Sequence, residues 1–134
     1  MRKDPDHWLY RLTPEEWLRA AENELKHAHA SLEGKQQRAG VAGARRAAGM
    51  AWNAVLALAA EPDPEYGRSY MDHLKAVARD AAIPQAVRLA AQALIDAPLD
   101  QKLVSLGRGD TRLAESAAAI VAHARERVAP PASA

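Results

Sequence analysis

The sequence predicts an all-α protein that folds as a single antiparallel, up-and-down bundle of about five helices. Alanine, the residue with the highest helix propensity, makes up roughly a quarter of the chain, and phenylalanine is absent. Apolar and small side chains recur every three or four residues in five segments, which is the pattern of amphipathic helices. The 134 residues suit one domain. We expect an ordered core over about 8–128, with flexible ends at 1–7 and 129–134.

The first predicted helix covers about residues 14–33. Thr13-Pro14-Glu15-Glu16 combines a capping hydroxyl, a proline at the first helical position and a glutamate three residues after the cap. Gly34 stands where a left-handed residue usually ends a helix. The apolar stripe of this helix consists of Trp17, Ala21, Leu25, Ala28 and Leu32.

The second predicted helix, over about 36–60, has the most regular periodicity in the chain. Glycine in the middle of a helix costs about 0.5–1 kcal/mol relative to alanine, so Gly40, Gly43 and Gly49 require compensation. The usual compensation is close approach of a neighbouring helix backbone, and close approach of a ligand is the less common alternative. The predicted buried stripe consists of Val41, Ala44, Ala48, Trp52, Val55 and Ala59.

Three further helices follow a connector that prolines 62 and 64 make stiff. Ser69 and Asp72 predict the cap of a third helix, which carries Tyr70, Leu74, Val77 and Ala81 and ends near Pro84. A fourth carries Val87, Ala90, Ala91, Leu94 and Ile95 and is closed by Pro98. Residues 99–110 are too apolar for a free linker, and we expect them to lie against the bundle. Asp110 then caps a fifth helix, whose buried side consists of Leu113, Ala117, Ile120, Val121, Ala124 and Val128.

Composition and charge narrow the function classes. The formal net charge is +1, so no global field attracts nucleic acid or lipid. The chain has no cysteine, which removes disulfides and thiolate metal sites and agrees with a reducing compartment. No stretch reaches the roughly 18 apolar residues of a membrane span, and the first residues lack the apolar region of a signal peptide. We therefore expect a cytoplasmic protein without membrane contact, and the alanine and arginine richness is typical of a bacterium with a GC-rich genome.

Arg68 and His73 form the only pair whose spacing suggests catalysis. In RNA cleavage by its own 2′-hydroxyl, the arginine would stabilise charge on the phosphate while the histidine moved a proton. The alternative is a solvated loop arginine and a partly exposed helical histidine, because two residue types at one permissive spacing arise readily by chance.

Glu24 and His27 have the spacing of di-iron bundles, but no second copy exists, so no metal or cofactor is expected.

The start of the second predicted helix is basic, because no acidic residue lies between Glu33 and Glu61. A phosphate could bind there to the free amides and to Lys35, Arg38, Arg45 and Arg46; the alternative is a solvated face paired with acids of the first helix.

Asn53 is the only strongly polar side chain between residues 47 and 60, and we expect it to bond to a neighbouring helix. A ligand role for Asn53 stays open, with Tyr66 or Tyr70 lining the same region. Trp17 and Trp52 are expected to be core or dimer contacts, whereas Trp8 and Tyr10 are expected to be exposed.

Three groups of positions carry a resemblance to a known superfamily. They are Trp17-Leu18-x-x-Ala21 with Leu25 and Ala28, Ala47-Ala48-x-x-Ala51 with Val55-Leu56, and Ala118-x-Ile120-Val121-x-x-Ala124 with Val128. With this layout the chain resembles the HEPN superfamily over about residues 13–128. The resemblance implies a small bundle, often homodimeric, that binds a nucleotide, a nucleic acid or a partner protein. The sequence departs from the superfamily in two respects: Asn53 and Ala57 replace a charged pair often seen in its second helix, and the arginine-to-histidine motif of its ribonucleases is missing from the last helices.

Three functions stay open. The favoured one is a non-catalytic HEPN-like module that binds a nucleotide, RNA or a partner protein and forms a homodimer. The second is a metal-independent ribonuclease that uses Arg68 and His73. The third is a HEAT-like scaffold for protein interaction, suggested by residues 83–94, although no second copy appears at a period of about 40 residues.

Overall fold

The computed structural model describes residues 7–99 and 109–128, and over these ranges the protein is helical and contains no strand. Seven elements follow one another: η1 (Trp8–Arg11), α1 (Pro14–Glu33), α2 (Gln37–Leu56), η2 (Pro64–Tyr66), α3 (Tyr70–Arg79), α4 (Gln85–Ile95) and α5 (Arg112–Val128). The predicted all-α class is thus confirmed. Within the described ranges, no helix combines the length and the apolar character needed to span a membrane. The predicted packing of residues 100–108 and the predicted flexible ends at 1–6 and 129–134 lie outside the described residues.

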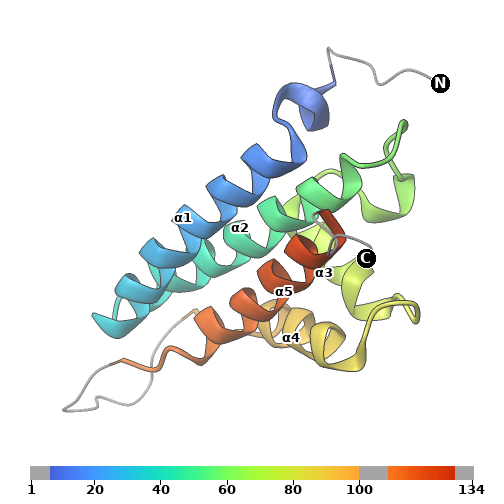
Figure 1. Cartoon of the computed structure of the whole chain (residues 1–134). Helices are drawn as coiled ribbons and strands as arrows, with labels where there is room; N and C mark the ends of the chain where they lie inside the picture. Colours follow the sequence, from blue (N-terminus) through green and yellow to red (C-terminus); the bar gives the residue numbers. More distant parts are fainter. Residues whose placement is uncertain (1–6, 100–108, 129–134) are drawn as a thin grey trace, which may run out of the picture.

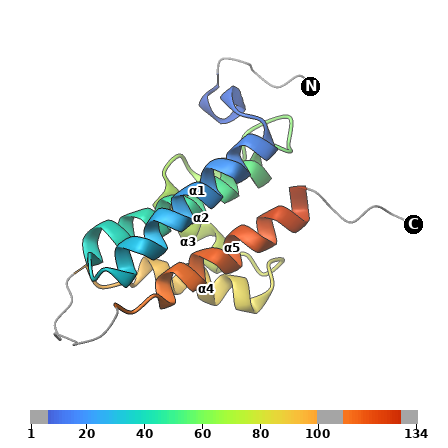
Figure 2. The ribbon, with the colours of Figure 1, turned by 60° about the vertical axis from the view of Figure 1, so that its left-hand side comes forward.

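The two long helices α1 and α2 lie side by side, because the chain reverses within a few residues after Glu33 (Figure 1). Helix α5 packs against both of them and against α4, and α3 packs against α2 and α4 (Figure 2). Helix α2 is therefore the central element. Both α1 and α5 contact it, and its far end meets α3.

Local capping signals determine where the helices begin. The Thr13 hydroxyl accepts from the Glu16 amide at 3.1 Å, and the Glu16 carboxylate accepts from the Thr13 amide at 2.9 Å. Ser69 and Asp72 make the same reciprocal pair at the start of α3. The start signals predicted at Thr13 and Ser69 are thus confirmed, whereas Asp110, which accepts from the Arg112 amide at 2.9 Å, lies one residue before the cap position of α5.

Three helix ends differ from prediction. Gly34 has φ −84°, and the left-handed residue is its neighbour Lys35, with φ 62°. The prediction of a left-handed Gly34 was therefore wrong. Ala59 and Ala81 are exposed, because α2 already ends at Leu56 and α3 at Arg79, so neither residue has a helical face to share.

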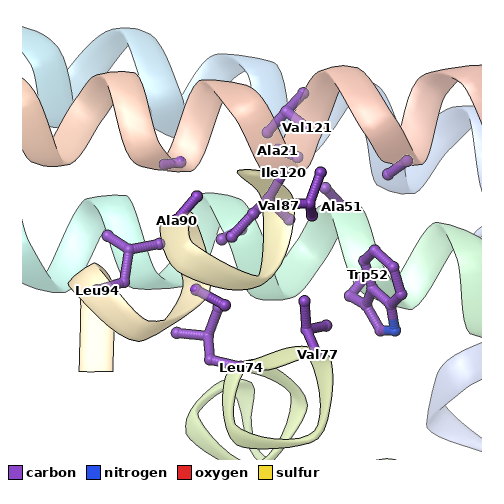
Figure 3. Packing of buried hydrophobic residues seen from close by; sticks show 14 of the residues in the cluster. Ala21, Ala51, Trp52, Leu74, Val77, Val87, Ala90, Leu94, Ile120 and Val121 are labelled. Carbon is purple, nitrogen blue, oxygen red and sulfur yellow. The ribbon is translucent and has the colours of Figure 1, made fainter. Parts of the chain in front are cut away.

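The core forms where four helices meet around the middle of α2 (Figure 3). Val41, Ala44, Ala48, Trp52 and Val55 are buried as predicted. Around Ala51 and Trp52 gather side chains from α3, α4 and α5: Leu74, Val77, Val87, Ala90, Leu94, Ile120 and Val121. At about 25 cal/mol per Å² of apolar surface, burial of this cluster is the main favourable contribution to folding.

The glycines of α2 provide room for close neighbours. A Cβ at Gly43 would lie 3.1 Å from Ala28 Cβ and 3.4 Å from Ala28 Cα, so α1 approaches α2 closely there, as predicted. A Cβ at Gly40 would collide with the Leu32 side chain and would lie 3.2 Å from the Leu32 backbone nitrogen, so α1 is close there too, whereas Gly49 accommodates the ring of Tyr70. The cost of a helical glycine is thus offset by packing against α1 at two positions and against the Tyr70 side chain at the third.

Candidate functional site

Two arginines of the predicted basic group at the start of α2 bind to different neighbours. Arg45 donates from Nε to the Leu94 carbonyl oxygen at 2.9 Å and from Nη2 to the Ile95 carbonyl oxygen at 3.2 Å. These are carbonyls of the last turn of α4, which have no partner within their own helix. Arg46 pairs instead with Glu24 of α1, at 3.4 Å. Lys35 lies between α1 and α2, and Arg38 lies in the first turn of α2.

Asn53 bonds to a neighbouring helix, as predicted, and its partner is His73 of α3. His73 Nε2 lies 2.8 Å from Asn53 Oδ1, and His73 Nδ1 lies 2.6 Å from the carbonyl oxygen of Tyr66. Both side chains have an exposed fraction of 0%. Two polar side chains in the core therefore link the end of α2, the start of α3 and η2.

The geometry of the pair restricts the protonation of His73. A carbonyl oxygen can only accept, so Nδ1 carries a proton in every state of the ring. In the structure Asn53 Oδ1 faces His73 Nε2 and can accept a hydrogen bond from it, which satisfies the imidazolium form, in which both ring nitrogens donate. If the Asn53 amide turned by half a turn, its Nδ2 would donate to Nε2, which satisfies the neutral ring. Asn53 Nδ2 is buried without a hydrogen-bond partner, and the half-turn would leave Oδ1 in that place, so neither orientation uses both amide atoms.

Burial lowers the pKa of His73, and this effect outweighs the Tyr66 carbonyl and the Asp72 carboxylate, which raise it. The ring is therefore neutral at pH 7. The expectation of a partly exposed His73 was wrong, and its ring nitrogens are not accessible to a substrate in this arrangement. Arg68 is exposed in the loop before α3, so the structure does not present the two residues together at one surface.

The N-terminal turn η1 covers the Asn53–His73 pair. The Trp8 ring stacks on His73 at 6.4 Å between centroids, and Tyr70 meets the same imidazole edge-on at 6.3 Å. Two hydrogen bonds hold the turn in place: Trp17 Nε1 donates to the Leu9 carbonyl at 2.9 Å, and the Tyr10 hydroxyl donates to the Ala59 carbonyl at 3.0 Å. Trp8 and Tyr10 are half-buried, so the prediction that they are exposed was wrong.

A hollow of about 360 Å³ opens between η1, the end of α2 and the connector. Its volume lies near the lower limit of small-molecule sites, which span roughly 300–1,000 Å³. The lining combines an indole, apolar side chains, one carboxylate and one guanidinium. The lining residues are His7, Trp8, Leu9, Leu56, Pro62, Asp63, Pro64, Gly67 and Arg68. Arg68 forms no ion pair with any residue of the described ranges.

Sequence reasoning missed the part of this hollow that η1 contributes. The available signal was the run Trp8-Leu9-Tyr10-Arg11-Leu12 directly before the first cap, because three large apolar side chains and a tyrosine rarely stay in water together. Leu9 is only 1% exposed, which shows that this run packs onto the bundle.

Tyr66 lies between the buried pair and a second hollow, of about 490 Å³. Its hydroxyl donates to Asp80 Oδ2 at 2.7 Å. Burial, followed by this bond, raises the pKa of Tyr66, and the same bond lowers the pKa of Asp80. The Tyr66 side chain is thereby bound to Asp80, and only its carbonyl faces His73.

No group of three or more histidine, aspartate or glutamate side chains in the described ranges could hold a metal ion. Comparisons with protein-family models, with characterised proteins and with solved structures find no match to this chain.

Proposed function

We propose that the chain is a non-catalytic, HEPN-like helical module that binds a nucleotide, free or as one unit of an RNA, in the hollow beside η1. The observation that supports this most is the presence of Trp8 and of the unpaired Arg68 in the lining of one hollow. Stacking of a base on an aromatic side chain contributes about 1–3 kcal/mol. A guanidinium matches the geometry of a phosphate, to which it donates two parallel hydrogen bonds.

The other lining residues agree with a nucleotide of this size. Leu56, Pro62 and Pro64 offer apolar surface to a sugar and a base, and Asp63 can accept a hydrogen bond from a ribose hydroxyl or an exocyclic amine. One carboxylate beside one arginine favours a single phosphate over a chain of phosphates, because a polyphosphate would place additional negative charge near Asp63.

Thermal shift and calorimetric titration with nucleoside monophosphates test this proposal, because a ligand that binds only the folded state raises the melting temperature. We expect Arg68→Ala to weaken binding by at least about tenfold, which corresponds to about 1.4 kcal/mol. Arg79→Ala is the matched control, since Arg79 is an exposed arginine that lines the second hollow instead. Equal affinities for Arg68→Ala and the wild type, or no binding of any nucleotide, would contradict the proposal.

Three further expectations belong to the same proposal: an antiparallel order of consecutive helices, a cytoplasmic location and, as the resemblance implies, a homodimeric state. Leu89 on α4 is 61% exposed, more than any other large apolar side chain of the described ranges, so a substitution there is a suitable probe for a contact between two copies. Sedimentation of the wild type and of Leu89→Glu tests whether a second copy covers this side chain. A monomer at all concentrations would remove the homodimer from the proposal.

A further inference from the structure

The buried Asn53–His73 pair has no part in the binding chemistry proposed above, yet it touches both walls of the hollow. On one side the His73 ring stacks on Trp8. On the other side its Nδ1–H donates to the carbonyl of Tyr66, the last residue of η2. The next two residues, Gly67 and Arg68, line the hollow.

We infer that His73 is a positioning residue for the nucleotide hollow, and that its proton exchange, coupled to a half-turn of the Asn53 amide, makes binding depend on pH. The inference rests on the proposed function for its binding arm, and it also makes a claim about the free protein. Two orientations of one amide correspond to two protonation states of one ring, and each orientation gives Nε2 a partner.

The wall on the η2 side is held in a conformation that depends on backbone contacts. Gly67 has φ 67° and ψ −160°, a region that glycine alone adopts readily. A Cβ at Gly67 would also collide with the Asp72 side chain. Asp72 Oδ2 accepts from the backbone amides of Arg68 and Ser69, each at 3.4 Å. The bond from His73 Nδ1 to the Tyr66 carbonyl persists in both protonation states, so the imidazole stays attached to the preceding end of this segment, two residues before Arg68.

The groups that face the imidazole decide the sign of the pH effect. They are the Trp8 ring from η1, the Tyr66 carbonyl from η2, the Asn53 amide from α2, and Tyr70 with the charged Asp72 from α3. His7, Asp63 and Arg68 are the ionisable groups of the hollow itself. An imidazolium behind Trp8 attracts the face of the indole and adds a positive charge behind the hollow. An anionic ligand therefore favours the protonated ring, and its affinity rises as the pH falls.

The first experiment uses the free protein. In ¹⁵N-labelled protein, the His73 ring nitrogens, the Trp8 indole N–H and the Gly67 amide are followed by NMR from pH 4.5 to 8. We expect the Trp8 and Gly67 resonances to titrate together with the His73 ring. The shift is expected to persist in His7→Gln, which removes the other imidazole beside Trp8, and to vanish in His73→Gln.

Asn53→Asp keeps the wild-type histidine and provides a test of the switch itself. A carboxylate can only accept, so it fixes the partner that the imidazolium requires. We expect the midpoint of the coupled transition to move to higher pH in this variant. A purely structural role of the pair would leave the Trp8 and Gly67 resonances unchanged over the whole range, both in this variant and in the wild type.

The second experiment measures the affinity for a nucleoside 3′,5′-cyclic monophosphate, whose single phosphodiester charge stays constant over this range. We expect binding at pH 5 to be at least about fivefold tighter than at pH 7.5, the lower limit of typical couplings between sites. His27→Gln, at an exposed histidine of α1 outside the hollow, is expected to retain this ratio, and His73→Gln to lose it.

The outcomes separate the two proposals. Coupled titration of Trp8 and His73 without any nucleotide binding would support the positioning role and contradict the proposed function. Binding that is equally strong at both pH values, in a protein whose Trp8 and Gly67 resonances do not follow His73, would support the function and overturn this inference.

Discussion

The two halves of α2 use their polar residues in opposite ways. The first half, residues 37–48, carries three arginines, yet Arg45 binds the last carbonyls of α4 and Arg46 binds a carboxylate of α1. The second half, residues 49–56, contains one polar side chain, Asn53, which is buried and bonds to His73. The charged side chains of Arg45 and Arg46 thus link the first half to α4 and α1. In the second half, the uncharged amide of Asn53 supports the wall of the hollow.

Desolvation explains this difference. An arginine reaches a helix end with its charged head partly in water and satisfies carbonyls that would otherwise lack a partner. A buried amide and imidazole have no such access to water, so their geometry must satisfy nearly every bond from within the protein. The second half of α2 is therefore more sensitive to the loss of one polar atom than the first half is to the loss of one charge.

Removal of the buried amide should have the largest effect. In Asn53→Ala, His73 Nε2 loses its partner, which costs about 1–3 kcal/mol, and a small cavity remains, so we expect the free energy of unfolding to fall by about 3 kcal/mol. Asn23→Ala, at an exposed asparagine of α1, is the control and should change it by less than about 0.5 kcal/mol. Denaturant unfolding measures both values, and similar losses would contradict the stabilising role of the buried amide.

Two adjacent arginines of the first half should differ from each other. Arg45→Gln removes two charge-assisted bonds to α4, and we expect a loss of about 1.5 kcal/mol. Arg46→Gln removes one exposed ion pair and should cost less than about 0.5 kcal/mol. Urea midpoints of the two variants check this order. If Arg46→Gln were the more harmful change, the role of Arg45 at the end of α4 would be wrong.

The glycines of the two halves also allow a direct comparison. Gly49→Ala would force the Tyr70 ring away, and overpacking of about 1–3 kcal/mol exceeds the helix-propensity gain of nearly 1 kcal/mol, so we expect a net loss of about 1 kcal/mol. At Gly43 the new methyl group meets Ala28 at a distance that is only slightly too short, so Gly43→Ala should lie within about 0.5 kcal/mol of the wild type. Thermal unfolding of both variants measures the difference.

The smallest expected effect is the dependence of stability on pH. Because burial lowers the pKa of His73, the unfolded state binds more protons than the folded state below about pH 6.5, and stability falls as the pH drops through this range. Between pH 7 and 5 we expect a loss of up to about 1 kcal/mol that is absent in His73→Gln. His123→Gln is the matched control, since burial also lowers the pKa of the more exposed His123. A slope that disappears in His123→Gln and persists in His73→Gln would contradict the assignment.

The sequence was sufficient to predict features that depend on neighbouring residues. The Thr13 and Ser69 caps, the buried stripe of α2 and the bond from Asn53 to another helix follow from local spacing and from the cost of burying an amide. The sequence could not predict that Trp8 lies on His73 or that Arg45 reaches Leu94. These pairs lie far apart in the chain, and only the final packing of η1, α3 and α4 brings them together. The basic run of α2 did not indicate that Arg45 binds the end of α4, because a charge pattern does not reveal which carbonyls lie within reach.

The most direct test of the account is a map of amide and indole resonances during titration with the cyclic nucleotide. The largest changes are expected at the Trp8 indole and at the amides of Gly67 and Arg68, around the second half of α2. Changes that concentrate at Lys35, Arg38 and the start of α2, with Trp8 unaffected, would place the binding site in the first half and contradict the account.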